Sequence, residues 1–254
     1  MKVCVLASGS KGNSTYISTP QNNLLIDLGL TSLAIERKIM QLGVDPSCIN
    51  AILITHTHTD HIGGLKVFLK KYHPKVYLTD KMYIDLKSIL YEDEYEIINN
   101  DFYLNGDLIE VIKTSHDASD SNGYIVHNSD KSVVYITDTG YINKRNHDRL
   151  RNHNVYIFES NHDVEKLRHG KYPYYLQQRI LGDEGHLSNK DSAYYLANFI
   201  GSKTSYIILA HLSEENNTEE LAYEMLSKTL EKHHKCVKNI KIAKQNEQTE
   251  LIEI

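Results

Sequence analysis

The sequence contains no tryptophan, four prolines, four phenylalanines and three cysteines among 254 residues. The cysteines, at positions 4, 48 and 236, are odd in number and far apart, so we expect no disulfide framework and a reducing cytoplasm. No apolar run approaches the roughly 20 residues that cross a bilayer. The short apolar start before Gly9 also lacks the full hydrophobic region of a signal peptide. We therefore predict a cytoplasmic protein without a membrane segment.

Positive charge is also in deficit, because 28 Lys and Arg residues face 33 Asp and Glu residues, for a formal net charge of −5. This balance excludes a protein that binds nucleic acid through overall charge, so a phosphate-rich substrate must be held by a local patch or by metal. The 41% hydrophobic content is typical of a globular fold. No linker or repeat interrupts the chain, which predicts a single domain over residues 1–254. Histidine, in contrast, is abundant, with 14 residues.

Short strand-like runs come in adjacent groups, and helical patterns occur in both halves of the chain. The expected helices cover residues 31–42, 61–72, 81–91, 174–181, 190–200 and 219–233. The expected strands cover residues 3–7, 15–18, 24–27, 51–55, 76–79, 96–99, 108–113, 123–127, 133–137, 155–159, 206–210 and 239–242. This grouping favours an α/β (α+β) fold in which two mixed β-sheets stack face to face between helices, a four-layer αββα sandwich. A doubly wound parallel sheet fits less well.

Four residues that can bind metal lie within six positions, at His56, His58, Asp60 and His61. They follow an apolar run of strand length, where the chain changes from strand to helix. In an extended segment the first three side chains point to one side, whereas His61 begins the helix and points elsewhere. Imidazole and carboxylate ligands suit Zn, Mn or Fe. A solvated polar loop is the alternative, and the preceding core strand disfavours it.

Three further ligand-type residues each follow an apolar strand: His116, Asp138 and His211. A single histidine in such a place is most often a surface or core residue. The repeated pattern of a strand followed by a ligand-type residue makes the set more informative than its members. We expect the remaining histidines to lie on the surface or at helix caps (73, 127, 147, 153, 162, 169, 233 and 234).

The seven residues, in this order, resemble the motifs of the metallo-β-lactamase fold superfamily, over nearly the whole chain. The resemblance implies two divalent metal ions per chain, Mn or Zn, with Fe as an alternative. It implies that His56, His58 and His116 hold one ion. It implies that Asp60, His61 and His211 hold the other, with Asp138 bridging both. A hydroxide shared by two such ions can attack phosphorus in an in-line displacement, with Asp60 contributing to the catalytic centre.

Further sequence segments narrow the resemblance. Glu159-Ser-Asn-His, Gly185-His-Leu-Ser-Asn and His211-Leu-Ser resemble the nucleic-acid-processing branch that includes ribonuclease Z. With the loop Ser8–Ser14, the chain resembles the YycJ/WalJ family, which is associated with 5′→3′ DNA exonuclease activity. The resemblance implies that Glu159 orients His186 and that His186 protonates the leaving oxygen. It also implies DNA as the partner. The alternative for His186 is a residue that caps the following helix.

The loop after the first strand contains Ser10, Lys11 and Asn13, which could bind a substrate phosphate through backbone N–H groups and the lysine charge. A plain hairpin turn is the alternative. Residues 141–180 have a net charge of +4, and residues 80–110 have −7, which could place a basic rim beside the metals. Arg149, Arg151, Lys171 and Arg179 would line such a groove. Tyr172, Tyr174 and Tyr175 either stack on exposed bases or join the core, and we expect the core for one or two of them.

Two other functions stay open from the sequence. The first is hydrolysis of a small phosphodiester, a thioester or a lactone, which a narrow closed pocket over the metals would favour. The second is a non-enzymatic scaffold with structural metals. The full ligand set together with His186 disfavours the scaffold, because structural sites rarely leave an open coordination position.

Overall fold

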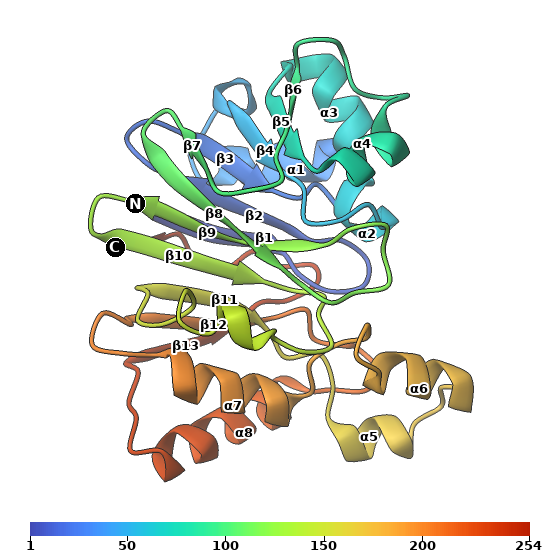
Figure 1. Ribbon diagram of the computed structural model, residues 1–254, viewed down its shortest axis with the longest axis vertical. Helices are drawn as coiled ribbons and strands as arrows, with labels where there is room; N and C mark the ends of the chain where they lie inside the picture. Colours follow the sequence, from blue (N-terminus) through green and yellow to red (C-terminus); the bar gives the residue numbers. More distant parts are fainter.

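The computed structural model describes residues 1–254 and contains two seven-stranded sheets packed face to face (Figure 1). The first sheet, in spatial order, consists of β14 (Ile252–Glu253), β1 (Lys2–Ala7), β2 (Ser14–Ser18), β3 (Asn23–Ile26), β4 (Ala51–Leu53), β5 (Lys75–Leu78) and β6 (Tyr95–Ile97). The second consists of β13 (Asn239–Ile242), β12 (Tyr206–Ala210), β11 (Val155–Glu159), β10 (Lys131–Ile136), β9 (Asn122–Asn128), β8 (Asp107–Lys113) and β7 (Phe102–Leu104). Both sheets mix parallel and antiparallel pairs, as predicted.

Helices cover both outer faces and complete the four-layer αββα arrangement (Figure 1). The elements beside the first sheet are α1 (Ser32–Gln41), α2 (Thr59–Ile62), α3 (Leu65–Tyr72) and α4 (Asp80–Leu86). The second sheet carries α7 (Asn189–Phe199) and α8 (Glu219–Lys232). Two more helices, α5 (Val164–Arg168) and α6 (Tyr174–Leu181), project from this side. None of these eight helices combines the length and the hydrophobicity that a membrane span requires.

Alternation along the strands creates three apolar layers. In β1, Val3 and Val5 point into the core between the sheets, whereas Cys4 and Leu6 point toward α1 and α3. The core between the sheets contains 22 buried residues drawn from both sheets. Successive side chains of a strand point to opposite faces, so a strand that is apolar at every position is buried on both sides. This pattern accounts for the continuous apolar runs of the sequence.

The helix predicted over residues 61–72 is wrong as a single element, because the chain forms α2 and α3 with a break at Gly63–Gly64. A Cβ atom on Gly64 would lie 2.2 Å from the carbonyl oxygen of Leu30. The neighbouring loop therefore approaches the backbone too closely for any other residue. This contact separates the first turn, which holds Asp60 and His61, from the packed helix that follows.

Because of strand direction, the loops in which a polar residue follows a strand lie at one edge of each sheet. Strands β1, β3 and β4 run in one direction in the first sheet, and β8, β10, β11 and β12 do so in the second. The two edges meet, because the backbone N–H of His211 donates to Ser8 Oγ at 2.7 Å. Another link joins Asn122 N to Thr55 O at 2.9 Å. Polar residues after seven strands thus converge on one place.

Candidate metal centre

The seven histidines and aspartates predicted as ligands form one cluster at this edge. His56, His58 and His116 place ligand atoms within 4.8 Å of one another, and so do Asp60, His61 and His211. A third such group joins Asp138 to His56 and His61. Asp138 is therefore close to both sets of three, as a bridging residue must be. The structure brings together all seven residues that the sequence analysis singled out.

Close backbone packing places Asp60 and His61 at the start of α2. A Cβ atom on Gly29 would lie 1.6 Å from the carbonyl oxygen of Asp60, so only glycine fits there. The backbone N–H of Asn13 donates to the same carbonyl at 2.8 Å, and Leu28 N donates to His61 O at 2.8 Å. Two loops, those after β1 and β3, thus hold the first turn of α2 in place.

Asp27 sets the orientation of the His61 ring. Its carboxylate is fully buried, accepts the backbone N–H of Thr55 at 2.8 Å and lies 2.8 Å from His61 Nδ1. A hydrogen bond at Nδ1 directs Nε2 into the cluster, where it lies 3.2 Å from Asp138 Oδ2. Burial alone would lower the pKa of His61, but the charges of Asp138 and Asp27 raise it well above its usual range.

His116 and His211 are oriented in the same way. His116 Nδ1 lies 3.3 Å from the carbonyl oxygen of Gly185, and His211 Nδ1 lies 3.0 Å from Glu159 Oε1. In each ring the outer nitrogen is occupied, which leaves Nε2 for the cluster. Burial, followed by the charge of His61, lowers the pKa of His56 well below its usual range. Neutral imidazole is the form that binds metal.

Three residues of this region have left-handed backbone: Asp27 (φ 61°), Asp138 (φ 53°) and His211 (φ 55°). Each follows a strand end. Non-glycine residues with positive φ are uncommon, and at functional sites the surrounding structure sustains their energetic cost. Here the backbone turns sharply after β3, β10 and β12, which directs the side chains toward the cluster.

Two buried atoms indicate that a cation fits here. Asp138 Oδ2 and His211 Nε2 are inaccessible to solvent and make no hydrogen bond of normal geometry; the polar atom 3.2 Å from Asp138 Oδ2 is His61 Nε2, itself a candidate ligand atom. Unsatisfied polar atoms in the interior are rare, because each loses its interaction with water without replacement. Buried imidazole and carboxylate atoms that converge within 4.8 Å provide nitrogen and oxygen donors of the type that binds divalent transition metals. The residues present therefore fit a divalent metal centre.

Buried Glu159 and partly exposed His186 form a pair beside the cluster. Glu159 Oε1 lies 2.7 Å from His186 Nδ1, and Oε2 accepts the backbone N–H groups of Thr139 and Leu187 at 2.9 and 3.2 Å. Both oxygens are occupied, so Glu159 is not free to bind a metal. Burial would raise the pKa of Glu159, but His186 lowers it to about 2. Burial would lower the pKa of His186, but Glu159 raises it to about 9.

Comparison with known proteins identifies the family. The model of the beta-lactamase superfamily domain matches residues 22–211. The exodeoxyribonuclease YycJ of Bacillus anthracis is 40% identical over 232 residues, which cover 89% of this chain and 88% of that protein. The exodeoxyribonuclease WalJ of Streptococcus pneumoniae is 40% identical over 229 residues, which cover 87% and 85%. The chain belongs to the YycJ/WalJ family.

The fold comparison agrees with this assignment. The metallo-β-lactamase fold protein YhfI from Bacillus subtilis superposes with a TM-score of 0.73 at 17% identity and covers 98% of both chains. The resemblance read from the sequence is thereby confirmed for family and fold. A YycJ/WalJ-family chain is a hydrolase of a fold that implies divalent metal binding, and the cluster above contains the candidate ligands.

Sequence reasoning missed several supporting residues of this YycJ/WalJ-family chain. Asp85 of α4 accepts Thr57 Oγ1 at 2.8 Å and Ser119 Oγ at 2.5 Å, so it joins the two loops that hold His58 and His116. Nothing in the local sequence indicates this link, because its partners are 28 and 34 residues away. Asp117 Oδ1 lies 3.5 Å from His116 Nε2, and its position beside a predicted ligand could have indicated it.

The expectation that the other histidines lie on the surface or at caps is wrong for two of them. His153 is buried and lies 2.9 Å from Ser132 Oγ and 2.7 Å from the carbonyl oxygen of Arg149. His162 is 1% exposed, and burial lowers its pKa to about 4. His153 lies just before β11 and His162 just after it, where packing around the sheet covers both residues.

The loop after β1 reaches the cluster, but its three predicted substrate residues differ in their exposure to solvent. Ser10 and Lys11 line an open hollow of about 270 Å³ together with Asp60. Asn13 is instead fully buried, donates to Gly9 O at 3.0 Å and lies 3.0 Å from His61 Nε2. Contact between Asn13 and a substrate is therefore a wrong prediction, because the side chain closes the loop from inside.

The basic residues expected to line one groove are also dispersed. Arg149 binds Asp101 at 2.6 Å and Glu110 at 2.7 Å, beside β8, whereas Arg179 pairs with Asp117 near the cluster. Arg151 lies 3.6 Å from Asp148 at an exposed site. A single basic groove through these arginines is a wrong prediction, since acidic partners hold them at separate places.

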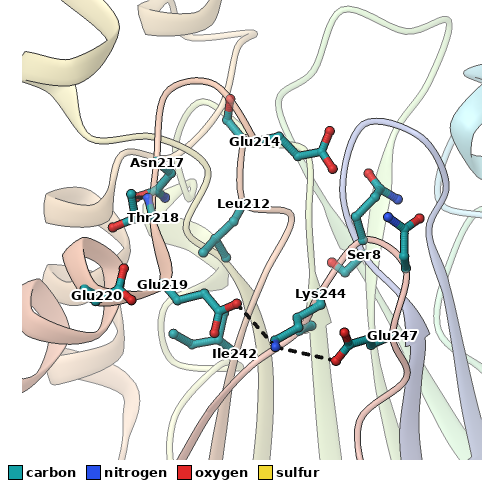
Figure 2. A pocket seen from close by; sticks show the side chains of 14 residues that line it. Ser8, Leu212, Glu214, Asn217, Thr218, Glu219, Glu220, Ile242, Lys244 and Glu247 are labelled. Atoms are coloured by element: carbon teal, nitrogen blue, oxygen red, sulfur yellow. Dashed lines mark hydrogen bonds and ion pairs between the residues drawn. The ribbon is translucent and has the colours of Figure 1, made fainter.

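A second hollow lies beside the cluster and not over it. It has a volume of about 490 Å³ and shares Ser8 with the loop that contacts His211. Figure 2 shows four glutamates around it, with Lys244 paired to Glu219 and Glu247. Acidic walls with a neutralised lysine repel phosphate, so this hollow is not the place where a phosphodiester would be cleaved.

Proposed function

We propose that this chain is a dinuclear-metal phosphodiesterase that removes nucleotides from the 5′ end of DNA in the cytoplasm. The observation that carries the proposal is the Glu159–His186 pair beside the seven-ligand cluster. Such a pair places a proton donor next to the centre that would bind the phosphate, where it can protonate the oxygen of a nucleotide leaving group. The names of the 40%-identical relatives, which are exodeoxyribonucleases, support DNA as the substrate.

In this proposal the seven cluster residues hold two divalent ions, Mn or Zn, with Fe as an alternative. One set is His56, His58 and His116, the other is Asp60, His61 and His211, and Asp138 belongs to both. When bound, the ions neutralise phosphate charge and acidify the attacking water. Asp27, Glu159 and the Gly185 carbonyl keep the histidine rings turned toward that place.

His186 acts as the general acid. Its Nδ1 is held by Glu159, so Nε2 is the atom that can donate a proton to the leaving 3′ oxygen. A pKa raised to about 9 keeps the ring protonated at neutral pH. An alkoxide is a poor leaving group, and positioned proton transfer accelerates such reactions roughly 10²–10⁴-fold. The side chain is 19% exposed, so a substrate can reach it.

Ser10 and Lys11 would receive the 5′-terminal phosphate in the hollow beside Asp60. The hollow is lined only by polar residues and glycines, including Thr31 and Thr59. Lys11 Nζ lies 2.5 Å from Glu214 Oε2, and its side chain is 65% exposed. An incoming phosphate can therefore replace this exposed carboxylate as the partner of the lysine.

The test is a cleavage assay on DNA labelled at the 3′ end, with either a 5′-phosphate or a 5′-hydroxyl. The metal-loaded enzyme is expected to shorten the labelled strand from its 5′ end, and faster with the phosphate. His58→Ala should abolish cleavage, whereas His233→Ala, at the exposed C-terminal cap of α8, should not. Intact DNA at enzyme concentrations that hydrolyse bis(p-nitrophenyl) phosphate would contradict the proposal and favour a small phosphodiester substrate.

A further inference from the structure

The two helices after β11 form an arm, defined here as residues 164–182, that projects from the molecule (Figure 1). Its second helix, α6, contains no buried residue, whereas α7 buries six. Helices in proteins owe most of their stability to packing of one face. A helix that buries nothing gains little from the fold itself, which indicates that its surface serves another purpose.

Tyrosines and cations dominate the surface of the arm. Of the three tyrosines, one or two of which we expected in the core, Tyr172 is partly buried, whereas Tyr174 and Tyr175 are each 75% exposed and lie outside it. Neither exposed side chain makes a hydrogen bond or an aromatic contact within the chain. Four cations, at positions 166, 168, 171 and 179, face one acid at position 165. Lys171 forms no ion pair.

The arm is joined directly to the candidate metal centre. Arg179 pairs with Asp117, the residue after His116. The Gly185 carbonyl contacts the His116 ring, and His186 follows in sequence. Tyr174 is five residues from Arg179, which corresponds to roughly 7–8 Å along a helix axis. The exposed tyrosines therefore lie within a few nucleotides of the place where a phosphodiester would be cleaved.

We propose that the arm binds single-stranded DNA on the 3′ side of the cleaved bond, with unpaired bases stacked on Tyr174 and Tyr175. This inference rests on the proposed function. Proteins that hold single strands without sequence preference combine aromatic side chains with nearby cations. Three acids from the neighbouring loops, at positions 117, 183 and 184, surround the C-terminal end of α6, so we expect bases rather than phosphates to lie against this helix. In a duplex each base is already stacked between its neighbours, so the arm selects single strands over duplex.

The test compares Y174A/Y175A with Y174F/Y175F, which keeps both aromatic faces. The control is Tyr103→Ala, because Tyr103 is also 75% exposed but lies on β7. With a 5′-phosphorylated 20-nucleotide single strand, the double alanine variant should raise KM about 10-fold or more and leave kcat unchanged. The phenylalanine variant and the control should match the wild type. Hydrolysis of bis(p-nitrophenyl) phosphate and of a dinucleotide, which is too short to reach Tyr174, should not change.

An unchanged KM for the 20-mer in the double alanine variant, with a wild type that cleaves it, would overturn the arm proposal alone. A change from dimer to monomer in the double alanine variant, with KM unchanged, would also overturn it and assign the arm to self-association. Failure of the wild type to cleave DNA would instead overturn the proposed function, and with it this inference.

Discussion

At the scale of single residues, Glu159 connects two parts of the site. Its Oε1 lies 2.7 Å from His186 Nδ1 and 3.0 Å from His211 Nδ1, so one carboxylate orients a proton donor and a candidate ligand. Buried carboxylates are stable as anions only when hydrogen bonds and cations compensate for lost hydration. The backbone N–H groups of Thr139 and Leu187 complete that compensation. Glu159 thus couples the position of the acid to that of the cluster.

Replacement of His186 separates its chemical role from a structural one. We expect His186→Ala to lower kcat on DNA about 100-fold or more, because the leaving alkoxide loses its proton donor. Hydrolysis of bis(p-nitrophenyl) phosphate should fall less than 10-fold, since p-nitrophenolate leaves without a proton. Steady-state rates on both substrates measure the difference. Equal losses on both would show that His186 only maintains the structure.

The contact between Gly29 and Asp60 predicts a severe effect of a single methyl group. A Cβ atom at Gly29 would lie 1.6 Å from the Asp60 carbonyl oxygen, so Gly29→Ala must displace the first turn of α2. We expect loss of metal affinity and an unfolding free energy lower by about 2 kcal/mol or more. Gly106→Ala is a suitable reference, because a Cβ there meets no atom within 4 Å, although its φ of 95° adds strain. Normal metal binding by Gly29→Ala would contradict this packing.

At the scale of elements, strand ends were predictable and the links between loops were not. The sequence patterns located the residues after β4, β8, β10 and β12 because an apolar strand followed by a polar residue is a local signal. The histidine and threonine partners of Asp85, Asn13 and Glu159 lie 27 to 52 residues away in the sequence, and local patterns contain no information on such contacts. The family resemblance implied the role of Glu159, whereas only the structure revealed the roles of Asp85 and Asn13.

The exposed helix α6 also shows that local sequence patterns do not reveal which elements pack together. Its apolar residues follow a helical spacing, which is typical of a helix that packs on a sheet. The structure instead leaves both Tyr174 and Tyr175 exposed, because no partner element covers them. The distribution of charge failed as a guide for a related reason, since Arg149 and Arg179 are bound by acids that are distant in sequence.

One ion-pair network predicts how stability depends on pH. Glu110 of β8 lies 2.7 Å from both His127 and Arg149. The hydrogen bond with His127, and then that with Arg149, lower its pKa to about 2 although burial opposes the shift. A folded-state pKa below that of the unfolded chain adds stability that is complete above about pH 5 and disappears as the pH falls toward 2.

We therefore expect Glu110→Gln to destabilise the fold by about 2 kcal/mol at pH 7, and by clearly less at pH 3. Urea unfolding of the metal-free protein at both pH values measures the change. Glu231→Gln, at an exposed position of α8, should stay within about 0.5 kcal/mol of the wild type at each pH. A Glu110→Gln effect that is constant across this range would contradict the assigned pKa.

At the scale of the whole molecule, we propose that residues 1–254 form one domain, since the 22-residue core draws on both sheets. Such a core predicts a single cooperative unfolding transition. Hydrogen exchange with mass spectrometry should show residues 14–26 of the first sheet and residues 122–136 of the second losing protection at the same urea concentration. Two separate midpoints would indicate two independent units.

The overall charge of −5 was a poor guide to function, whereas the histidine count was informative. Five of the 14 histidines lie in the cluster and a sixth pairs with Glu159. The proposed function requires that this cluster hold two divalent ions. The most direct test is the metal content per chain after reconstitution with Mn or Zn, removal of excess metal, and inductively coupled plasma mass spectrometry. We predict two ions in the wild type and one in His58→Ala or in His211→Ala. A wild type that retains none, or a content that neither variant changes, would contradict the dinuclear centre.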